Sequence, residues 1–418
     1  MSGEPNSRRA SLDARVLAWM RESPPLPGTG RDRAEAGASA ADARFDALAR
    51  EVFAFQFGHC TPYRHFCQAR GTTPDSVAHW SRIPAVPTGA FKEVALRCFP
   101  PERERKVFRT SGTSSARRGE LHLDTLELYE TSLASTLHRF LFPDLRASAT
   151  GSPGPRMTIR VLAPSPEEAP DSSLSHMFGC ALENFGCRDS GYEVRDGRLE
   201  IEGLAERLAA ACAARRPVAL CGTAYAFVHL LEGLETMGTN AGAMTLAPGS
   251  RIMETGGFKG RAREMPRETL HAALEAGFGI PREYIVNQYG MTELGSQFYD
   301  SSLRNALAGR PSGPRRKLGP AWARVRIVDP ETGDDAEPGE IGMIAICDLA
   351  NTGSVAAVQT ADLGRRIPAP GHGEREVGSD EDGFEVLGRE PGAEERGCSI
   401  AADVMLGEAT PEKAPWTS

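Results

Sequence analysis

The sequence VFRTSGTSSARRGE, residues 107–120, decides the interpretation of this chain. Its centre, Thr110 to Ser115, contains five hydroxyl side chains and one glycine, and no apolar side chain that could be buried. Hydroxyl groups donate hydrogen bonds, and glycine lets backbone N–H groups approach a ligand closely. Arg117 and Arg118 add positive charge. These features predict a polyphosphate-binding loop, and an ordinary Ser/Thr-rich surface turn is the alternative.

The residues around this loop predict an α/β fold. A helix is expected to begin near Asp124–Thr125, because Glu127 has the spacing of a capping box and apolar residues recur at helical spacing as far as Phe140. Farther along, apolar strands such as 158–163 and 217–221 alternate with helices such as 199–214. This alternation is typical of parallel strand pairing.

The composition limits the possible classes of function. The chain has 418 residues, 40% of them hydrophobic, with a net charge of -8 and no strongly basic segment, which argues against a nucleic-acid partner. No apolar run is long enough for a membrane span, and the N-terminus lacks the apolar region of a signal peptide. Nine cysteines without a repeating framework predict reduced thiols and a cytoplasmic location.

Two histidines and two cysteines lie close together at His59, Cys60, His65 and Cys67. Their spacing does not match a common zinc finger, and no second pair of cysteines at CxxC spacing follows. Packing at a helix end is therefore the favoured interpretation, with a metal site as the alternative.

Two later turns carry side chains that suit a nucleotide. The strand in 250–255 ends at Gly256 and Gly257, where a flat adenine ring could lie against the backbone, and Lys259 could face phosphate. A solvated basic turn is the alternative for this segment. In the second turn, at 284–294, Tyr289 can stack on a base and Glu293 can bind Mg²⁺ through oxygen.

The order of these motifs resembles the adenylate-forming superfamily of acyl-CoA synthetases and, within it, the long-chain acyl-protein synthetases of the LuxE type. The resemblance covers about residues 83–400. It is carried by VPTGAFKEVAL, FRTSGTSS, ETGGFKGRAREM, NQYGMTELGSQFYD and GFEVLGREPGAEERGCSIAADVML. It implies ATP-dependent and Mg²⁺-dependent activation of a carboxylic acid, a fatty acid in that family, to an acyl-adenylate. The acyl group would then pass to a thiol of the enzyme or of a partner protein, such as an acyl reductase.

The resemblance also implies a role for each matching residue. Asp362 would hold the ribose hydroxyls, and Arg389 would approach the ribose or a phosphate. Thr292 would bind the α-phosphate and Glu293 would bind the metal. Lys259 is not one of these matching residues but the candidate to replace the cation of the superfamily's C-terminal catalytic lysine. The nucleotide-binding residues implied in full are Thr110, Ser111, Gly112, Thr113, Ser114, Gly256, Gly257, Tyr289, Gly290, Asp362 and Arg389.

Two departures from the superfamily pattern affect the expected mechanism. In the phosphate loop, Ser115-Ala116-Arg117-Arg118-Gly119 stands in place of the usual Thr-Gly-x-Pro-Lys, so any cation there must be arginine. The second departure lies near the C-terminus. Only 29 residues follow Arg389, so the mobile C-terminal domain with its catalytic lysine is expected to be truncated or absent. Cys398, which follows Arg396 and Gly397, is the thiol expected to carry the acyl group. A small buried hydrophobic residue is the alternative for Cys398.

The expected architecture is a large adenylation-type α/β domain with mixed or parallel sheets flanked by helices, plus a smaller β-rich subdomain. Its parts are a flexible N-terminal segment (1–40), an α/β core (41–310), the β-rich subdomain (311–390) and a vestigial C-terminal segment (391–418).

Two other functions compete with the acyl-protein synthetase. One is an acyl- or aryl-CoA ligase of the phenylacetate type, against which the missing C-terminal domain argues. The other is a non-catalytic nucleotide-binding subunit, against which Thr292, Glu293 and Asp362 argue.

Overall fold

The computed structural model describes residues 4–22, 31–111, 117–145, 154–238, 244–256, 265–310, 313–330, 332–368, 382–389 and 404–406. The chain divides into two compact units whose segments interleave along the sequence. The first comprises Met1–Leu133, Met291–Ser296 and Leu318–Ser418, and the second comprises Ala134–Gly290 and Gln297–Lys317. Two elements, α5 (Glu127–Phe140) and β12 (Lys317–Leu318), contain points where the chain passes from one unit to the other.

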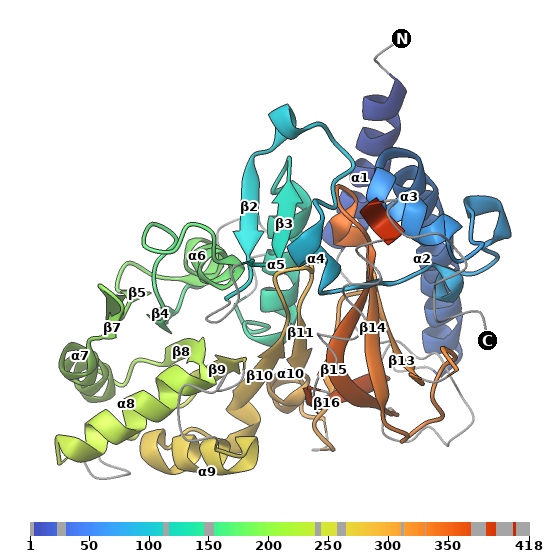
Figure 1. Cartoon of the computed structure of the whole chain (residues 1–418). Coiled ribbons are helices and arrows are strands. Elements are labelled where there is room, and N and C mark those ends of the chain that lie inside the picture. The colour runs from blue at the N-terminus through green and yellow to red at the C-terminus, as the bar shows by residue number, and fades with distance from the viewer. Residues whose placement is uncertain are drawn as a thin grey trace. The chain divides into compact units, whose positions relative to one another are not determined.

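The first unit is built on an antiparallel sheet, which is labelled in Figure 1. Strand β14 pairs with β13 on one side and with β15 on the other, and β16 pairs with β15. The short strand β1 runs parallel to the beginning of β15. Strands β13 and β14 form an antiparallel pair within the segment expected to be β-rich, 311–390. The strand bounds are β1 (Val86–Pro87), β13 (Ala323–Val328), β14 (Gly342–Asp348), β15 (Ala357–Ile367) and β16 (Gly383–Arg389).

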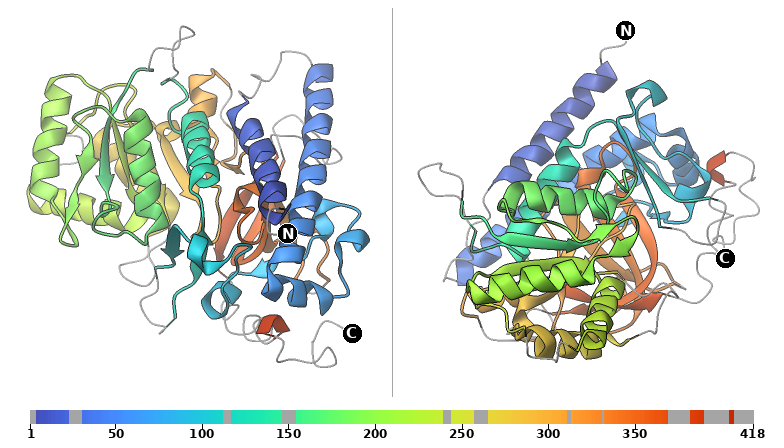
Figure 2. Two further views of the ribbon diagram at one scale, coloured as in Figure 1. Left: turned by 90° about the horizontal axis from the view of Figure 1, so that it is seen from above. Right: turned by 90° about the vertical axis from the view of Figure 1, so that its left-hand side faces the viewer.

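Helices of the first unit come mainly from the N-terminal part of the chain. The bounds are α1 (Glu4–Arg21), α2 (Arg31–His59), α3 (Thr61–Gln68) and α4 (Ala90–Glu93). Helices α1 and α2 pack side by side (Figure 2), and α1 buries an apolar face that includes Val16. Helix α2 begins inside the N-terminal segment 1–40, which is expected to be flexible. Its alanine-rich first turns have high helix propensity, which outweighs the single Gly37.

The helix after the hydroxyl-rich loop begins later than expected. Helix α5 starts at Glu127, whose backbone N–H donates to the Thr125 hydroxyl at 3.2 Å. Asp124 instead forms ion pairs with Arg9 at 2.7 Å and with Arg103 at 3.1 Å. The Asp124 carboxylate therefore joins α1 to the segment that follows the hydroxyl-rich loop, and it does not cap α5 as expected.

The second unit is an α/β layer with a mostly parallel sheet. Its strand order is β11-β10-β9-β8-β4-β5, and only β11 is antiparallel to its neighbour. The parallel pairing expected from the alternation of strands and helices is confirmed. The bounds are β4 (Thr158–Leu162), α6 (Ser173–Phe185), β5 (Gly191–Tyr192), β6 (Val194–Arg195), β7 (Arg198–Leu199), α7 (Ile201–Ala213), β8 (Val218–Thr223), α8 (Ala224–Thr236), β9 (Arg251–Thr255), α9 (Arg267–Phe278), β10 (Ile285–Tyr289), β11 (Phe298–Asp300) and α10 (Ser302–Leu307).

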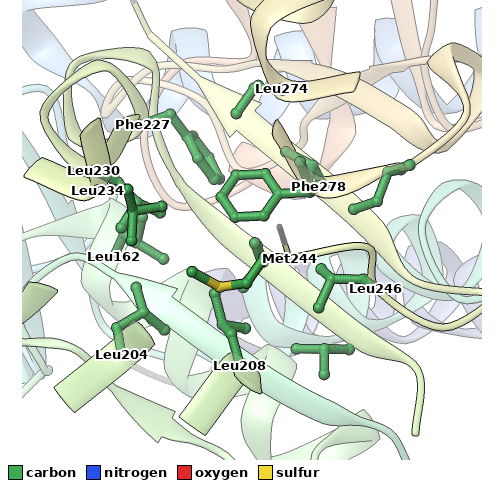
Figure 3. Close-up of a cluster of buried hydrophobic side chains, with 14 of the residues drawn as sticks. Leu162, Leu204, Leu208, Phe227, Leu230, Leu234, Met244, Leu246, Leu274 and Phe278 are labelled. Atoms are coloured by element: carbon green, nitrogen blue, oxygen red, sulfur yellow. The ribbon is translucent and has the colours of Figure 1, made fainter. Parts of the chain in front are cut away.

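A large apolar core lies between this sheet and the helices α7, α8 and α9 (Figure 3). Alternate strand residues, such as Leu220, Ile252 and Ile285, point into it, as the two-residue period of a strand requires. Figure 1 draws α6 on the other side of these strands, so both sheet faces are covered by helices. Each fully buried Leu, Ile or Phe contributes roughly 1.5–3 kcal/mol, so this core fixes the strands whose ends carry the predicted turns.

A third pairing is the two-stranded hairpin of β2 (Lys106–Arg109) and β3 (Glu120–Leu123) in the first unit. The hydroxyl-rich loop connects these two strands, so the loop is held at both ends by paired strands. Arg109 and Glu120 pair across the end of the hairpin, with 2.8 Å between Arg109 Nε and Glu120 Oε1.

The eight cysteines within the described residues are free thiols. Cys60 and Cys67 are buried, and His59 stacks on Phe55 with 4.2 Å between ring centroids. These contacts agree with helix-end packing for that segment. Among the described residues, no helix combines the length and the apolar character that crossing a membrane requires.

Candidate active site

The base of the hydroxyl-rich loop is closed by Thr110 and Gly119. The Thr110 N–H donates to the Gly119 carbonyl, and the Gly119 N–H donates to the Thr110 hydroxyl, both at 2.9 Å. Ser111 follows directly, while Gly112, Thr113 and Ser114 lie outside the described residues. The conformation of the loop base therefore depends on the Thr110 side chain.

The structure brings Glu293 to this loop base. A Cβ atom built on Gly119 would lie 3.1 Å from Thr110 Cγ2 and 3.4 Å from Glu293 Oε1. The Glu293 carboxylate, the Thr110 side chain and Gly119 thus surround one small volume within the first unit. Glu293 and its neighbour Thr292 are both buried. The carboxylate and hydroxyl oxygens gathered here are the donor type that Mg²⁺ prefers.

The two arginines beside the loop are engaged in its local structure. Arg118 Nε donates to the Thr110 carbonyl at 2.6 Å, and Arg117 pairs with Glu93 at 2.7 Å. The sequence predicted only that these residues add positive charge. Arg118 also closes the loop base, since its guanidinium binds the carbonyl of the residue that begins the loop.

The turn that carries Thr292 and Glu293 is held by the segment after β14. Asn351 Nδ2 donates to the Glu293 carbonyl at 2.8 Å, and the Ser296 hydroxyl donates to Asp348 Oδ1 at 2.7 Å. Trp322 Nε1 donates toward the Ser296 hydroxyl at 3.1 Å. Burial raises the pKa of Asp348 to about 6, against the opposing effect of the Ser296 hydroxyl and nearby backbone N–H groups. Neither Asp348 nor Asn351 was predicted from the sequence.

Asp362 and Arg389, both predicted to contact the nucleotide, lie opposite each other on β15 and β16. Arg389 Nε is 3.2 Å from Asp362 Oδ1, and the arginine side chain is 64% exposed whereas the aspartate side chain is 13% exposed. The pair therefore combines a fixed carboxylate with a cation that keeps access to solvent.

In the second unit, Gly256 and Tyr289 lie at the carboxyl ends of neighbouring parallel strands. Thr255 of β9 is in register with Gln288 of β10, and Gly256 and Tyr289 are the next residue on each strand. Gly256 has a φ of 74°, a left-handed conformation that favours glycine. Gly257 and Lys259 lie outside the described residues. In parallel sheets this edge is the usual ligand site.

Gly290 and Gln288 lie at the same edge of the sheet. A Cβ atom on Gly290 would come within 2.6 Å of Gln288 Nε2, so the Gln288 amide packs directly against this glycine. The Thr255 hydroxyl bonds to the Gln288 side-chain oxygen. The Tyr289 ring centroid lies 6.3 Å from that of Phe298. The tyrosine is half-buried, as a residue that offers one ring face to a ligand would be.

A buried polar network lies below this edge and was not predicted. Glu254 Oε1 is 3.1 Å from His271 Nε2 and accepts a hydrogen bond from Asn287 Nδ2 at 2.7 Å. Lys317 Nζ donates to the Asn287 carbonyl at 2.9 Å and to Asp300 at 2.6 Å. The signal in the sequence was a carboxylate or an amide within a buried strand, Glu254 in β9 and Asn287 in β10.

Solved structures identify the fold of this chain. The chain matches 2-hydroxyisobutyryl-CoA ligase in complex with 2-HIB-AMP in the postadenylation state, with a TM-score of 0.60, 13% identity, and coverage of 88% of this chain and 72% of that one. An open conformation of the same ligase matches with a TM-score of 0.56 and 14% identity, covering 88% and 80%. The fold is therefore the mixed α/β fold of adenylate-forming ligases.

Comparison of the amino-acid sequence with known families identifies the family of this chain. The model of the acyl-protein synthetase family, LuxE, matches residues 183–407. The chain belongs to this family. The long-chain-fatty-acid–luciferin-component ligase of Aliivibrio fischeri is 22% identical over 321 residues, which are 76% of this chain and 78% of that protein. The enzyme of the same name from Photorhabdus luminescens is 33% identical over 67 residues, 16% of this chain and 57% of that protein.

Proposed function

We propose that this protein uses ATP to activate a carboxylic acid, a long-chain fatty acid by analogy with its relatives, and passes the acyl group to a protein thiol. The observation that carries the proposal is the meeting of the Glu293 carboxylate, Thr110 and Gly119 at the base of the hydroxyl-rich loop. Membership of the acyl-protein synthetase family supports it. The family and the fatty-acid ligase relatives favour this function over a free CoA ligase or a non-catalytic subunit.

In the first step, a carboxylate oxygen of the acid attacks the α-phosphorus of ATP. The bond from that phosphorus to the bridging oxygen breaks, so acyl-adenylate forms and pyrophosphate leaves. Bound Mg²⁺ would neutralise phosphate charge, and the oxygen donors at Glu293 and Thr110 fit such an ion. Thr292 would bind the α-phosphate, and the loop from Ser111 to Ser114 would hold the leaving phosphates. The contribution of the chain is positioning and charge stabilisation.

The residues proposed for the nucleoside are described within each unit: Tyr289, Gly256 and Gly290 in the second unit, and Asp362 and Arg389 in the first. Tyr289 would stack on the adenine, beside the backbone at Gly256 and Gly290. Asp362 would accept hydrogen bonds from the ribose hydroxyls, because its carboxylate is fixed by β15 and by Arg389. Exposure of the Arg389 side chain would let it reach the ribose or a phosphate.

In the second step, a thiolate sulfur attacks the acyl carbon, and AMP leaves with its electron pair on the phosphate oxygen. Cys398 is the proposed thiol and Lys259 the proposed additional cation, and both lie outside the described residues. An acyl reductase or another acyl-accepting protein would take the acyl group from the thioester. A Cys398→Ser variant incubated with radiolabelled acid and ATP tests this step, since label retained on the protein would remove Cys398 from the role.

Carboxylate-dependent exchange of pyrophosphate into ATP tests the first step. With Mg²⁺ present and short, long and aromatic acids supplied separately, exchange is expected with at least one acid and to be strongest with long alkyl chains. Exchange confined to aromatic acids would replace the proposed substrate class. A complete lack of exchange with every acid would overturn the proposed function.

Glu293→Gln tests the role of the carboxylate with almost no change of volume. The exchange rate is expected to fall about 10²-fold, because the variant keeps the shape but removes the negative charge from the proposed metal ligand. Glu337→Gln, an exposed position in the turn between β13 and β14, is the matched control and should exchange like the wild type. Equal rates in the two variants would contradict the assignment of Glu293.

A further inference from the structure

The segment after β14 presents one buried amide to the turn that carries Glu293. Asn351 ends a one-turn 3-10 helix, Leu349–Asn351, and is almost fully buried. Its Nδ2 donates to the Glu293 carbonyl at 2.8 Å across 58 positions of sequence. The orientation of the amide is determined by this contact, because only the NH₂ group can donate to a carbonyl.

Three different elements hold the backbone around Asn351. Gln56 Nε2 of α2 donates to the Asn351 carbonyl at 2.8 Å, and the Gln56 side-chain oxygen accepts from the Ala356 N–H at 3.0 Å. The Thr352 hydroxyl donates to Asp13 of α1 at 2.6 Å. Asp348 accepts from the Ala350 N–H at 3.0 Å. The amide of Asn351 therefore projects from a rigid base.

The turn itself is packed against the same segment. A Cβ atom on Gly295 would lie 2.7 Å from Ala350 Cβ and 3.1 Å from Asn351 Oδ1, so the two backbones approach as closely as glycine allows. Ser296 is bound to Asp348 at the end of the turn. The contacts at Glu293, Gly295 and Ser296 leave the turn little freedom to shift or rotate.

This arrangement leaves polar atoms without partners. Within the described part of the chain, Asn351 Oδ1 and Asp348 Oδ2 are buried and make no hydrogen bond. A buried polar atom without a partner costs about 1–3 kcal/mol. A segment selected for stability alone would satisfy or remove these atoms, whereas such costs are common where a fixed geometry serves a function.

We propose that Asn351 is a positioning residue for adenylation: it holds the Glu293 backbone so that the Glu293 carboxylate points to the loop base at Thr110 and Gly119. The backbone carbonyl of Glu293 is fixed by Asn351, while its side chain reaches the volume beside Gly119. Asn351 acts through Glu293 and contacts no proposed substrate atom. This inference rests on the proposed function of Glu293 and deepens it.

Asn351→Asp is the sharpest test, because it replaces the Nδ2 donor by an oxygen of nearly the same size. That oxygen would face the Glu293 carbonyl, so the turn should lose its anchor while the packing around it is kept. The maximal rate of acid-dependent pyrophosphate exchange is expected to fall about 10²-fold, with the KM for the acid within about threefold of wild type. Ser354→Ala is the matched control, since it removes a buried hydrogen bond to the Leu96 carbonyl from the same segment and does not contact the turn.

Hydrogen–deuterium exchange supplies a readout that is independent of activity. Peptides covering 291–296 should exchange about tenfold faster in Asn351→Asp than in wild type and should be unchanged in Ser354→Ala. If Asn351→Asp does not fold, Asn351→Ala removes the donor without adding a repelling oxygen, and the same two measurements apply.

Each outcome has a definite meaning. Unchanged deuterium exchange in 291–296 overturns the inference, and so does faster exchange without loss of rate in a protein whose wild type is active. An inactive wild type, tested across the acid panel, removes the proposed function itself. A loss of rate in Ser354→Ala equal to that in Asn351→Asp would mean that the segment contributes stability only, and would also overturn the inference.

Discussion

Two buried aspartates, one in each unit, have opposite electrostatic environments. Asp300 of the second unit accepts hydrogen bonds from Lys317 at 2.6 Å and from Arg315 at 3.0 Å. Burial raises the pKa of Asp300, but the two cations outweigh it and leave the pKa below its ordinary value. Asp348 of the first unit accepts from the Ser296 hydroxyl and the Ala350 N–H, and burial raises its pKa to about 6.

The difference shows two ways to hold a turn near a site. Around Asp300 the positive and negative charges compensate each other, so the charged form of the carboxylate is favoured. The network joins β10, β11 and β12. Around Asp348 the partners are neutral, so the protonated carboxyl is favoured at low pH and the charged form is costly. The first arrangement stabilises the strands, whereas the second fixes the turn of Thr292 and Glu293 at the expense of stability.

The largest expected effect comes from breaking the compensated network. Lys317→Met keeps a long side chain but removes the cation, and burial of the remaining Asp300 charge becomes more costly. Unfolding in urea should show a loss of about 3–5 kcal/mol relative to wild type. The double variant Asp300→Asn with Lys317→Met should recover most of this loss, because no unpaired charge then remains. A loss below about 1 kcal/mol in the single variant would show that Arg315 alone compensates Asp300.

A second effect follows from the raised pKa of Asp348. The folded protein keeps this proton up to about pH 6, whereas the unfolded chain releases it near the ordinary value of 3.8. The native state therefore binds more protons between these values, and the free energy of unfolding contributed by this group falls as pH rises from about 4 to about 6. Its size is on the order of 3 kcal/mol, and it is absent above pH 6.

Asp348→Asn isolates this contribution, because the amide keeps an oxygen acceptor for Ser296 and carries no titrating proton. The free energy of unfolding of the variant, minus that of wild type, should rise as pH increases from about 4 to about 6. Urea unfolding at several pH values measures this difference. A constant difference across that range would show that Asp348 is not responsible.

The sequence predicted the parts of the fold that depend on local pattern. Apolar periodicity identified the strands at Thr158–Leu162 and Val218–Thr223 and their parallel pairing, and the order of the motifs identified the family. The prediction of a flexible segment was wrong at Arg31, where α2 begins, because the alanine-rich sequence that follows has high helix propensity. Asp348 and Asn351 were missed because their partners lie 52 and 58 positions away, and a local pattern cannot supply such partners.

The smallest expected effects compare two glycines of the first unit. Gly295→Ala should lower the free energy of unfolding by about 2 kcal/mol, because its Cβ would lie 2.7 Å from Ala350 Cβ and one of the two backbones must move. Gly58→Ala, in the last turn of α2, meets no atom within 4 Å and should raise stability by about 0.5–1 kcal/mol through higher helix propensity. Urea unfolding gives both values. Deuterium exchange in 291–296 should increase only in Gly295→Ala, since that glycine alone separates the Glu293 turn from Asn351. An equal and small effect of the two substitutions would mean that the turn can move away from Asn351 without cost. The Asp348 network would then not fix the turn, and its proposed difference from the Asp300 network would be contradicted.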